Sequence, residues 1–144
     1  MTHANHDETC IFCKIINLEI PAVKVYEDDS VLAFLDIRPV NKGHTLVIPK
    51  DHFENIYSVP AELWCRMMLV AQKVAIGIKN AVSADGINII MNNESAAGQL
   101  VFHAHIHVIP RENEDGLVHW PHKSYIDEEE TKNIAEKIRD ALSL

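Results

Sequence analysis

The segment from Val101 to Pro110, VFHAHIHVIP, alternates histidine with apolar side chains over most of its length. Successive side chains of a β-strand point to opposite faces of a sheet, so this alternation predicts a strand with one apolar face and one imidazole face. The apolar face is expected to enter the core and comprises Phe102, Ala104, Ile106 and Val108. The imidazole face comprises His103, His105 and His107. Imidazole can act as nucleophile, acid or hydrogen-bond donor near neutral pH, so this row is the first candidate functional site.

Hydrophobic periodicity and turn residues predict four more strands and two helices. The strands are expected at residues 23–27, 31–36, 44–50 and 87–92, and a short N-terminal helix at residues 11–18. A long helix is expected to have Ser58 as its N-cap and Pro60 in its first turn. Its apolar stripe comprises Leu63, Met67, Val70, Val74 and Ile78. These elements predict a single α+β domain, a five-stranded antiparallel sheet with its helices on one face.

The chain has 144 residues, of which 47% are hydrophobic, and this size and composition suit one globular domain. Residues 1–9 are expected to be disordered, residues 10–112 to form the domain, and residues 113–144 to form a C-terminal extension. A helix is expected in that extension at about residues 127–142. The acidic run from Asp127 to Glu130 suits the start of that helix and is interpreted as solvated.

Charge and hydropathy exclude several classes of function. A formal net charge of −8 would repel a phosphate backbone, so no nucleic-acid partner is expected. No apolar run approaches the roughly 20 residues of a membrane span, and the polar N-terminus lacks a signal-peptide pattern, so a cytoplasmic protein without a membrane partner is expected. ATP-driven work and a dinucleotide fold also lack support, because neither a Walker loop nor a G-x-G-x-x-G stretch is present.

Several segments together resemble the histidine triad (HIT) family of nucleotide hydrolases and transferases. HAHIHVI matches the alternating signature of that family, and GQLV, from Gly98 to Val101, matches the segment that precedes it. FLDIRPVNKGHTLVIPKDH (34–52) and CIFCKIINLEIPAVKVYEDD (10–29) resemble the upstream segments of the family in the same order. The likeness therefore covers roughly residues 10 to 111.

This resemblance implies catalysis on the α-phosphate of a nucleotide, in the manner of a bacterial-type purine nucleoside phosphoramidase. His105 would be the nucleophile, forming a nucleotidyl-histidine that water resolves to a nucleoside monophosphate. A backbone carbonyl within the triad would hold its other ring nitrogen. His107 and His44 would contact phosphate, and His103 would complete the catalytic group. Leu100 replaces a serine that is frequent in the phosphoramidase branch, so the leaving group stays open between an amine and a second nucleotide.

The same resemblance implies a nucleotide pocket. Asp36 would accept hydrogen bonds from ribose hydroxyls, while Ile37, Phe12 and Ile11 would form an apolar slot for a purine base. The groups implied for the phosphate site are Asn92 or Asn93, the backbone at Gly98, and Gln99. Carboxylate for hydroxyls, donors for phosphate and apolar walls for a ring form a combination that suits a nucleotide.

Cys10 and Cys13 are separated by two residues, a spacing that supplies two ligands of a tetrahedral zinc site. They could instead be buried thiols or a redox pair. In some branches of the family such a pair binds a structural zinc together with two histidines, which here would be His52 and His103. That role would withdraw His103 from proton transfer. Cys65, in the predicted long helix, is interpreted as a packing residue.

Two further functions stay open at this stage. A nucleotide-binding scaffold would keep the pocket with little turnover, and a zinc hydrolase would use the triad histidines as metal ligands. The resemblance also implies a homodimer, paired through the long helix and a neighbouring strand.

Overall fold

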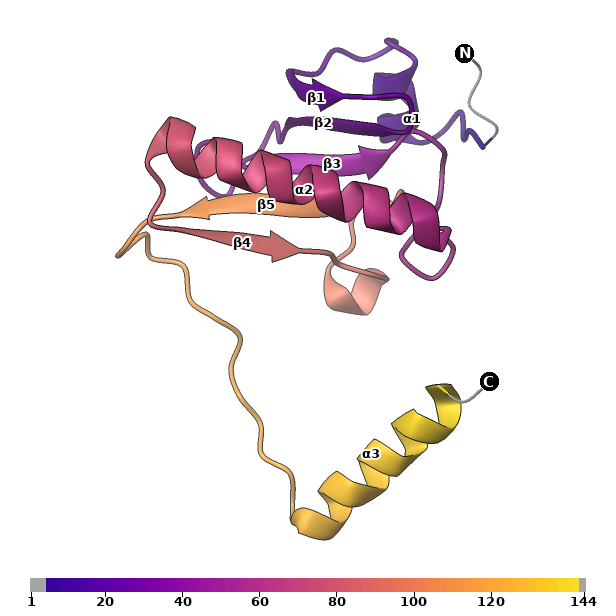
Figure 1. Ribbon diagram of the computed structural model, residues 1–144, viewed down its shortest axis with the longest axis vertical. Coiled ribbons are helices and arrows are strands. Elements are labelled where there is room, and N and C mark those ends of the chain that lie inside the picture. The colour runs from indigo at the N-terminus through magenta and orange to yellow at the C-terminus, as the bar shows by residue number, and fades with distance from the viewer. Residues whose placement is uncertain (1–4, 143–144) are drawn as a thin grey trace.

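Five antiparallel strands form one sheet with the order β1-β2-β3-β5-β4 in the computed structural model, which describes residues 5–142 (Figure 1). The strands are β1 (Lys24–Glu27), β2 (Val31–Leu35), β3 (Thr45–Pro49), β4 (Gly86–Ile90) and β5 (Ile106–Arg111). The α-helices are α1 (Ile11–Ile16), α2 (Ala61–Val82) and α3 (Glu128–Leu142), and a short 3-10 helix, η1, spans Ser95–Ala97. The predicted α+β domain with a five-stranded sheet, a long helix and a short N-terminal helix is confirmed.

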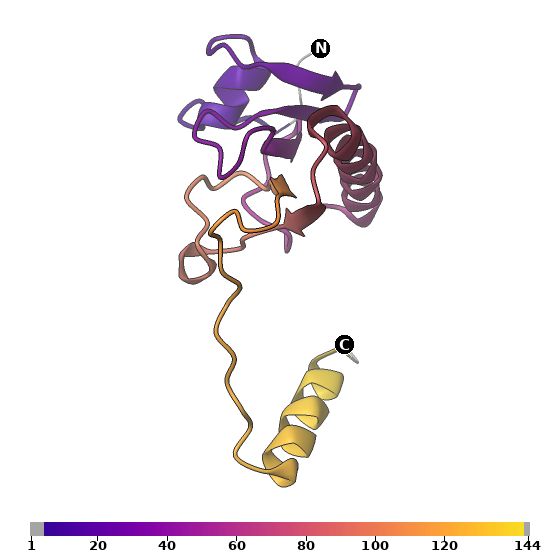
Figure 2. The same cartoon turned by 90° about the vertical axis from the view of Figure 1, so that its left-hand side faces the viewer.

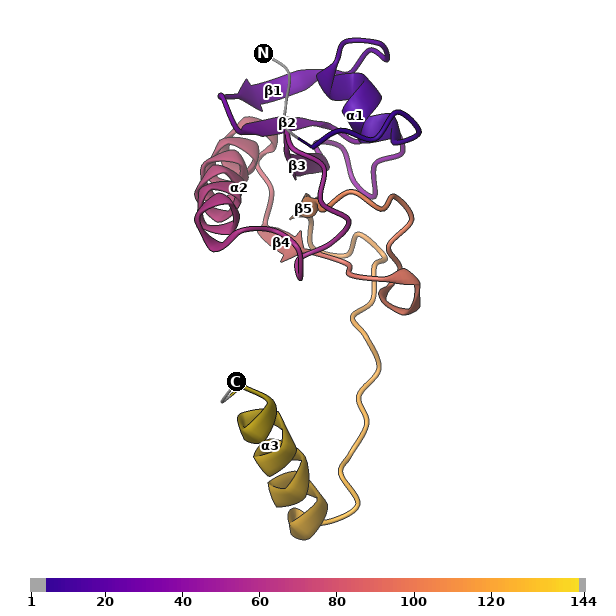
Figure 3. The ribbon, with the colours of Figure 1, turned by 90° about the vertical axis from the view of Figure 1, so that its right-hand side faces the viewer.

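The long helix α2 covers one face of the sheet, as Figures 2 and 3 show from the two sides. Its predicted apolar stripe is confirmed: Met67, Val70 and Val74 are buried, and Leu63 and Ile78 are partly buried. The sheet contributes the other half of this core, through Val31, Ala33, Val47, Ile106 and Val108. Alternate residues of β2, β3 and β5 therefore anchor the helix.

The prediction that all helices lie on one face is wrong. Helix α1 packs on the face opposite α2, where Phe12, Cys13 and Ile15 are buried. The sheet residues beneath it are Leu32, Phe34, Leu46 and Ile48. Since β2 and β3 are nearly continuous apolar runs, both of their faces need cover, and a helix on each side provides it.

The last strand is shorter than the alternation predicts. Pairing begins only at Ile106, and residues 101–105 do not form a strand. Phe102, expected in the core, is 44% exposed. The backbone N–H of Ala104 donates instead to the carbonyl of Phe53, with an N–O distance of 2.6 Å. This contact holds residues 101–105 away from β3. The alternation of apolar and histidine side chains therefore occurs in a segment whose backbone is not hydrogen-bonded into the sheet.

The start of α2 also differs from the prediction. Helix α2 begins at Ala61 with Pro60 at its N-cap, and Ser58 donates its hydroxyl to the carbonyl of Asn55 instead of capping the helix. Cys65, expected to pack, is exposed on the outer side of the helix.

The N-terminal segment is hydrogen-bonded to the domain where the structure describes it. Residues 1–4 lie outside the described residues, but the N–H of Asn5 donates to the Asp51 carboxylate and the Asn5 carbonyl accepts from the N–H of His52. These contacts bind the chain start to the segment that follows β3. The expected disorder of residues 1–9 stays a prediction.

The C-terminal arm, defined as residues 113–142, leaves the end of β5 and reaches well beyond the sheet (Figure 1). Its helix α3 has the bounds expected from the sequence to within one residue, and it begins with the Asp127 carboxylate accepting from the N–H of Glu130 at 2.7 Å. None of the residues of α3 is buried. Across residues 5–142, no helix combines the length and apolar character needed to cross a membrane.

A polar network ties the β1–β2 turn to α2. Arg66 of α2 donates to the carboxylate of Asp28, with an Nε–Oδ2 distance of 2.8 Å, and also to the hydroxyl of Tyr26. Burial opposes ionisation of Asp28, but hydrogen bonds from the N–H of Ser30, from Arg66 and from the N–H of Val31 outweigh it and lower its pKa. The ionised carboxylate is therefore part of the folded structure.

Replacing Arg66 with Met should lower the free energy of unfolding by about 1 kcal/mol at pH 7, because a half-buried carboxylate loses its charged partner. The depressed pKa of Asp28 means that this contribution is complete above about pH 4 and is lost as the pH falls further. Urea unfolding should therefore show the difference between wild type and Arg66→Met narrowing below pH 4. Lys73→Met, an exposed change on the same helix, serves as the control and should show no such pH dependence.

Candidate functional site

Four thiol and imidazole groups meet where the N-terminal segment crosses the end of β3. Cys10, Cys13, His52 and His103 place their ligand atoms within 4.8 Å of one another. The Sγ of Cys10 lies 3.5 Å from Nδ1 of His103, and the Sγ of Cys13 lies 3.5 Å from Nδ1 of His52. Burial raises the pKa of the Cys13 thiol to about 11, so a bare cluster would hold it protonated.

This cluster fits a tetrahedral metal ion. Metal–sulfur distances of about 2.3 Å and metal–nitrogen distances of about 2.0–2.1 Å give sulfur–nitrogen edges of about 3.6 Å. The observed sulfur–nitrogen separations are 3.5, 3.5 and 3.7 Å. The Nε2–H of His103 donates to the carbonyl of Pro49 at 2.8 Å, which leaves Nδ1 unprotonated and aimed at the thiols. The donor set and its supporting hydrogen bond are compatible with a closed four-ligand metal site.

His105 is not a member of this cluster and has a defined tautomer. Its Nδ1–H donates to the carbonyl oxygen of His103 at 2.6 Å, so the lone pair of Nε2 is available for reaction. The ring is 5% exposed and meets the Phe12 ring edge-on, with centroids 5.3 Å apart. The backbone carbonyl implied by the family resemblance is thus present.

A chain of hydrogen bonds fixes the other two imidazoles. The N–H of Val40 donates to Nδ1 of His44, so His44 carries its proton on Nε2. That Nε2–H donates to Nδ1 of His107 at 2.9 Å, which leaves His107 with a proton on its own Nε2. The relay therefore presents a neutral N–H donor beside His105, whose ring centroid lies 4.9 Å from that of His107.

Burial keeps these imidazoles uncharged at neutral pH. Burial, followed by the neighbouring His105 and His44, lowers the pKa of His107 to about 4. Burial likewise lowers the pKa of His44 and the pKa of His105. An unprotonated imidazole is the form that can act as a nucleophile, and an anionic group placed here would raise these pKa values again.

The hydrogen bond within the relay argues against the triad as a metal site. Oxygen and nitrogen atoms of Asp36, His44 and His107 lie within 4.8 Å of one another. However, Nε2 of His44 and Nδ1 of His107 are only 2.9 Å apart, whereas two nitrogen ligands of one tetrahedral zinc are separated by about 3.3 Å. His103, moreover, belongs to the cysteine cluster, so the three triad imidazoles do not converge on one point.

The residues expected to bind the nucleoside differ in their positions: some lie against the histidines, and others are exposed. Asp36 lies beside the relay, with Oδ2 3.8 Å from Nε2 of His44, and accepts from the N–H of Arg38. Phe12 is buried against His105, whereas Ile11 and Ile37 are exposed and free to cover a ligand. The structure thus brings a carboxylate and an aromatic wall to the same histidine group.

The loop from Asn92 to Val101 carries polar side chains that are bonded within the protein and one that is available to a ligand. Asn93 accepts from the N–H of Ile56 at 2.8 Å, whereas the side chain of Asn92 has no hydrogen bond among residues 5–142. Gln99 is buried: its amide donates to the carbonyls of Glu54 and Val101 and accepts from the N–H of Glu94. Its side chain therefore holds the loop in place and offers no free donor to phosphate.

Gly98 adopts a conformation that few side chains allow. It has a positive φ of 88°, and an added Cβ would lie 3.8 Å from Nδ2 of Asn92. The N–H of Gly98 is already used, in a bond to the carbonyl of Ser95. Glu94 also has a positive φ, of 70°, which the Gln99 contact stabilises. The role of Gly98 is therefore to shape the loop beneath Asn92.

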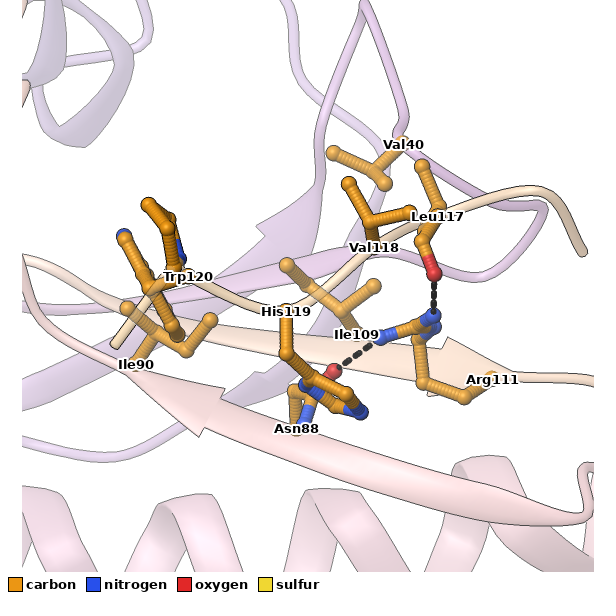
Figure 4. A pocket seen from close by; sticks show the side chains of 10 residues that line it. Val40, Asn88, Ile90, Ile109, Arg111, Leu117, Val118, His119 and Trp120 are labelled. Carbon is orange, nitrogen blue, oxygen red and sulfur yellow. Dashed lines mark hydrogen bonds between the residues drawn. The ribbon is translucent and has the colours of Figure 1, made fainter.

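A cavity of about 350 Å³ lies beside this group on the same face of the sheet, between β4, β5 and the start of the C-terminal arm (Figure 4). Its walls include Ile90, Ile109, Val118 and Trp120, and no triad histidine lines it. Its one cation, Arg111, is already bound to Asp115, Asn88 and the carbonyl of Leu117. The cavity is thus mainly apolar and distinct from the histidine group.

Sequence reasoning missed the backbone groups that set the tautomers. The Val40 N–H and the Pro49 carbonyl each fix one imidazole, and both lie far along the chain from the triad. No side-chain pattern encodes them, because any residue type carries these atoms. Their position follows only from the path of the chain around β3.

A family model, the HIT domain, matches residues 17–114. The chain belongs to the histidine triad family. Its match agrees with the sequence resemblance over most of the domain.

Known members of the histidine triad family are similar over nearly the whole chain. The adenosine 5'-monophosphoramidase of Schizosaccharomyces pombe is 43% identical over 133 residues, covering 90% of this chain and 96% of the relative. A zinc-bound histidine triad protein from Mycobacterium smegmatis is 40% identical, with a TM-score of 0.73 over 94% of this chain and 96% of its own.

A crystal structure from Streptococcus mutans UA159 is 42% identical, with a TM-score of 0.91, and covers 96% of this chain and 88% of its own. Helix α3 alone is 15 of the 144 residues, so this overlay includes most of that helix.

Substitution of the two adjacent asparagines should have different effects on the free energy of unfolding. Asn93→Ala removes the acceptor of the Ile56 N–H and should lower the free energy of unfolding by about 1–2 kcal/mol. Asn92→Ala removes no protein hydrogen bond and should change it by less than about 0.5 kcal/mol. Chemical denaturation of both variants checks this, and an equal loss in the two would contradict the division of roles.

Proposed function

We propose that this protein is a hydrolase or transferase that cleaves a substituent from the α-phosphate of a purine nucleoside 5'-phosphate derivative. The observation that carries the proposal is the bond from Nδ1–H of His105 to the His103 carbonyl, which leaves the lone pair of Nε2 free. The relative named as an adenosine 5'-monophosphoramidase supports a phosphoramidate as the substrate class.

In the proposed reaction, Nε2 of His105 attacks the α-phosphorus, and the bond from phosphorus to the substituent breaks with its electron pair going to the substituent. The His103 carbonyl stabilises the positive charge that forms on the attacking imidazole. His107 takes up a proton when the anionic phosphate binds and delivers it to the departing group.

Water then attacks the same phosphorus, the bond from phosphorus to Nε2 breaks, and the nucleoside monophosphate leaves. His107 accepts the proton that the water gives up, so the catalytic group returns to its starting state. Before His107 takes up a proton, the hydrogen bond from Nε2–H of His44 to its Nδ1 fixes the ring with its Nε2–H available to the phosphate.

Nucleotide recognition is proposed for the polar groups that the fold leaves available. Asn92 is the phosphate-contacting asparagine, because Asn93 is already bound to Ile56. Asp36 accepts from ribose hydroxyls, and exposed Ile11 and Ile37 cover the base. Gln99, which the resemblance places in the phosphate site, acts through the loop that carries Asn92.

We also propose that Cys10, Cys13, His52 and His103 bind one structural zinc ion. The ion would pin the N-terminal segment to the sheet without taking part in the reaction. His103 joins the two sites, since its ring faces the thiols while its carbonyl holds His105. A reduced cysteine pair is consistent with the expected cytoplasmic location.

A homodimer is proposed on the exposed apolar surface of the domain. Leu69 and Ile76 lie seven residues apart on the outer side of α2 and are 53% and 58% exposed. Strand β4 is an edge of the sheet, with one row of unpaired backbone groups. A helix face beside an open edge is a surface that a second copy can cover with twofold symmetry.

Adenosine 5'-phosphoramidate tests the proposed activity. Wild-type protein should release AMP, and His105→Ala should lower kcat/KM by at least about 10³-fold, because the nucleophile is lost. Intact-mass measurement during turnover should detect an adenylated wild-type chain and no adduct on the variant. The exposed His6→Ala change is the control and should retain full activity.

Equal activity in wild type and His105→Ala would show that His105 is not the nucleophile. AMP binding by both proteins without turnover of this substrate would favour the nucleotide-binding scaffold instead.

Zinc binding should depend on the buried cysteines and not on the exposed Cys65. Protein purified without chelator should contain about one zinc per chain, and Cys13→Ser should lose most of it together with several degrees of melting temperature. Cys65→Ser should match wild type in both measurements, because that thiol is exposed on α2. Metal analysis and thermal unfolding check this, and zinc retained by Cys13→Ser would contradict the assigned ligand set.

A further inference from the structure

The loop from Asp36 to His44 carries the backbone group that sets the tautomer of the histidine relay. The N–H of Val40 donates to Nδ1 of His44, with an N–N distance of 3.1 Å. His44 immediately precedes β3, where pairing of Thr45 with Val108 fixes the backbone. The ring of His44 is thus held by the sheet, whereas its donor belongs to a loop outside the sheet.

One side chain connects this loop to the rest of the protein. Within residues 5–142, the hydrogen bonds of residues 37–42 that reach beyond the loop all come from Nδ2 of Asn41. This amide donates to the carbonyl of Pro110 at 2.9 Å and to the carboxylate of Asp115 at 3.0 Å. The backbone carbonyl of Asn41 also accepts from the N–H of His44. Asn41 therefore clamps the loop at the position next to Val40.

The acceptor of this clamp is itself held in place. Asp115 accepts from Nε and Nη2 of Arg111, at 2.6 and 2.8 Å, and from the N–H of Leu117. These bonds, led by those from Arg111, hold the pKa of the Asp115 carboxyl well below its usual range, so the acceptor is ionised. Nη1 of Arg111 donates to Asn88 of β4, as Figure 4 shows. The clamp thus ties the loop to both β4 and β5.

The tautomer of His44 decides which atom His107 offers to a ligand. With the Val40 N–H in place, His44 carries its proton on Nε2 and donates to Nδ1 of His107, so His107 has an N–H at Nε2. Without that N–H, His44 can carry its proton on Nδ1 and accept from Nδ1–H of His107 instead. Nε2 of His107 would then present a lone pair, which repels an anion.

We propose that Asn41 is a positioning residue for the relay: by clamping its loop to Pro110 and Asp115, it holds the Val40 N–H against His44 and so keeps an N–H on Nε2 of His107. The side chain of Asn41 bonds to β5 and to the arm rather than to an imidazole, so it acts through Val40. Its effect on nucleotide binding rests on the phosphate contact proposed for His107, whereas its effect on the tautomer does not.

Imidazole nitrogen NMR tests the position of the protons directly. In ¹⁵N-labelled wild-type protein at neutral pH, His44 and His107 should both carry their proton on Nε2 and have an unprotonated Nδ1. Single His→Gln variants assign the two sets of signals. A proton on Nδ1 of His44 in the wild-type protein would overturn the proposal.

Substitutions of Asn41 should change this tautomer. Asn41→Ala removes both donors, and Asn41→Asp places an oxygen where the amide donated, so both variants should populate the form of His44 with its proton on Nδ1. Both should bind AMP at least about 10-fold more weakly, because the phosphate loses an N–H donor and meets a lone pair. Asn41→Ser keeps one donor and should give a smaller change in the same direction; it replaces Asn41→Ala if that variant does not fold.

Two controls separate positioning from a general loss of stability. Arg66→Met disrupts a network on the other face of the sheet, at α2. Asn113→Ala removes an exposed side chain of the arm that has no hydrogen bond within residues 5–142. Both controls should keep the wild-type tautomers and the wild-type affinity for AMP.

Wild-type tautomers in the folded Asn41 variants would overturn the proposal, whatever their stability or AMP affinity. A changed tautomer with unchanged AMP affinity would support the positioning role of Asn41 and would contradict the phosphate contact proposed for His107 instead.

Discussion

His103 is the residue on which both sites depend. Its ring donates to the Pro49 carbonyl and turns its free nitrogen toward the thiols of Cys10 and Cys13, while its backbone carbonyl holds His105. One buried residue therefore sets the tautomer of His105, the proposed nucleophile, and completes the cysteine–histidine cluster. The N-terminal segment therefore contacts the His105 group in two ways, through His103 and through Phe12, whose ring meets that of His105.

The electrostatic character of the histidine group differs from that of the whole chain. The surface carries a net charge of −8, yet burial leaves the imidazoles uncharged and arranged as directed donors and acceptors. An anionic phosphate would be bound by N–H groups of neutral rings, with proton uptake by His107 following the arrival of that charge. This arrangement keeps His105 unprotonated until substrate is present, which is the state that nucleophilic attack needs.

The two ends of the chain have different relations to the domain. The N-terminal segment is fastened to the sheet by hydrogen bonds at residues 5 and 52 and by the cysteine cluster. The C-terminal arm, in contrast, lines the cavity beside β4 and β5 with its first part, where Val118 is 93% exposed, and then leaves the sheet. The N-terminal segment therefore contributes to the cysteine cluster and contacts His105, whereas helix α3 contributes no residue to either.

The sequence by itself determined the chemistry and most of the elements. The spacing of the cysteines, the order of the motifs and the 3.6-residue period of α2 are local properties, so they could be read without coordinates. The tertiary structure alone decided that α1 covers the opposite face, that residues 101–105 leave the ladder, and that Asn92 rather than Asn93 is free. Each of these depends on a contact between distant segments, such as Ala104 with Phe53 or Asn93 with Ile56. Backbone partners of that kind carry no residue-specific signal, which is why periodicity predicted the histidine row but not the backbone contacts that orient its rings.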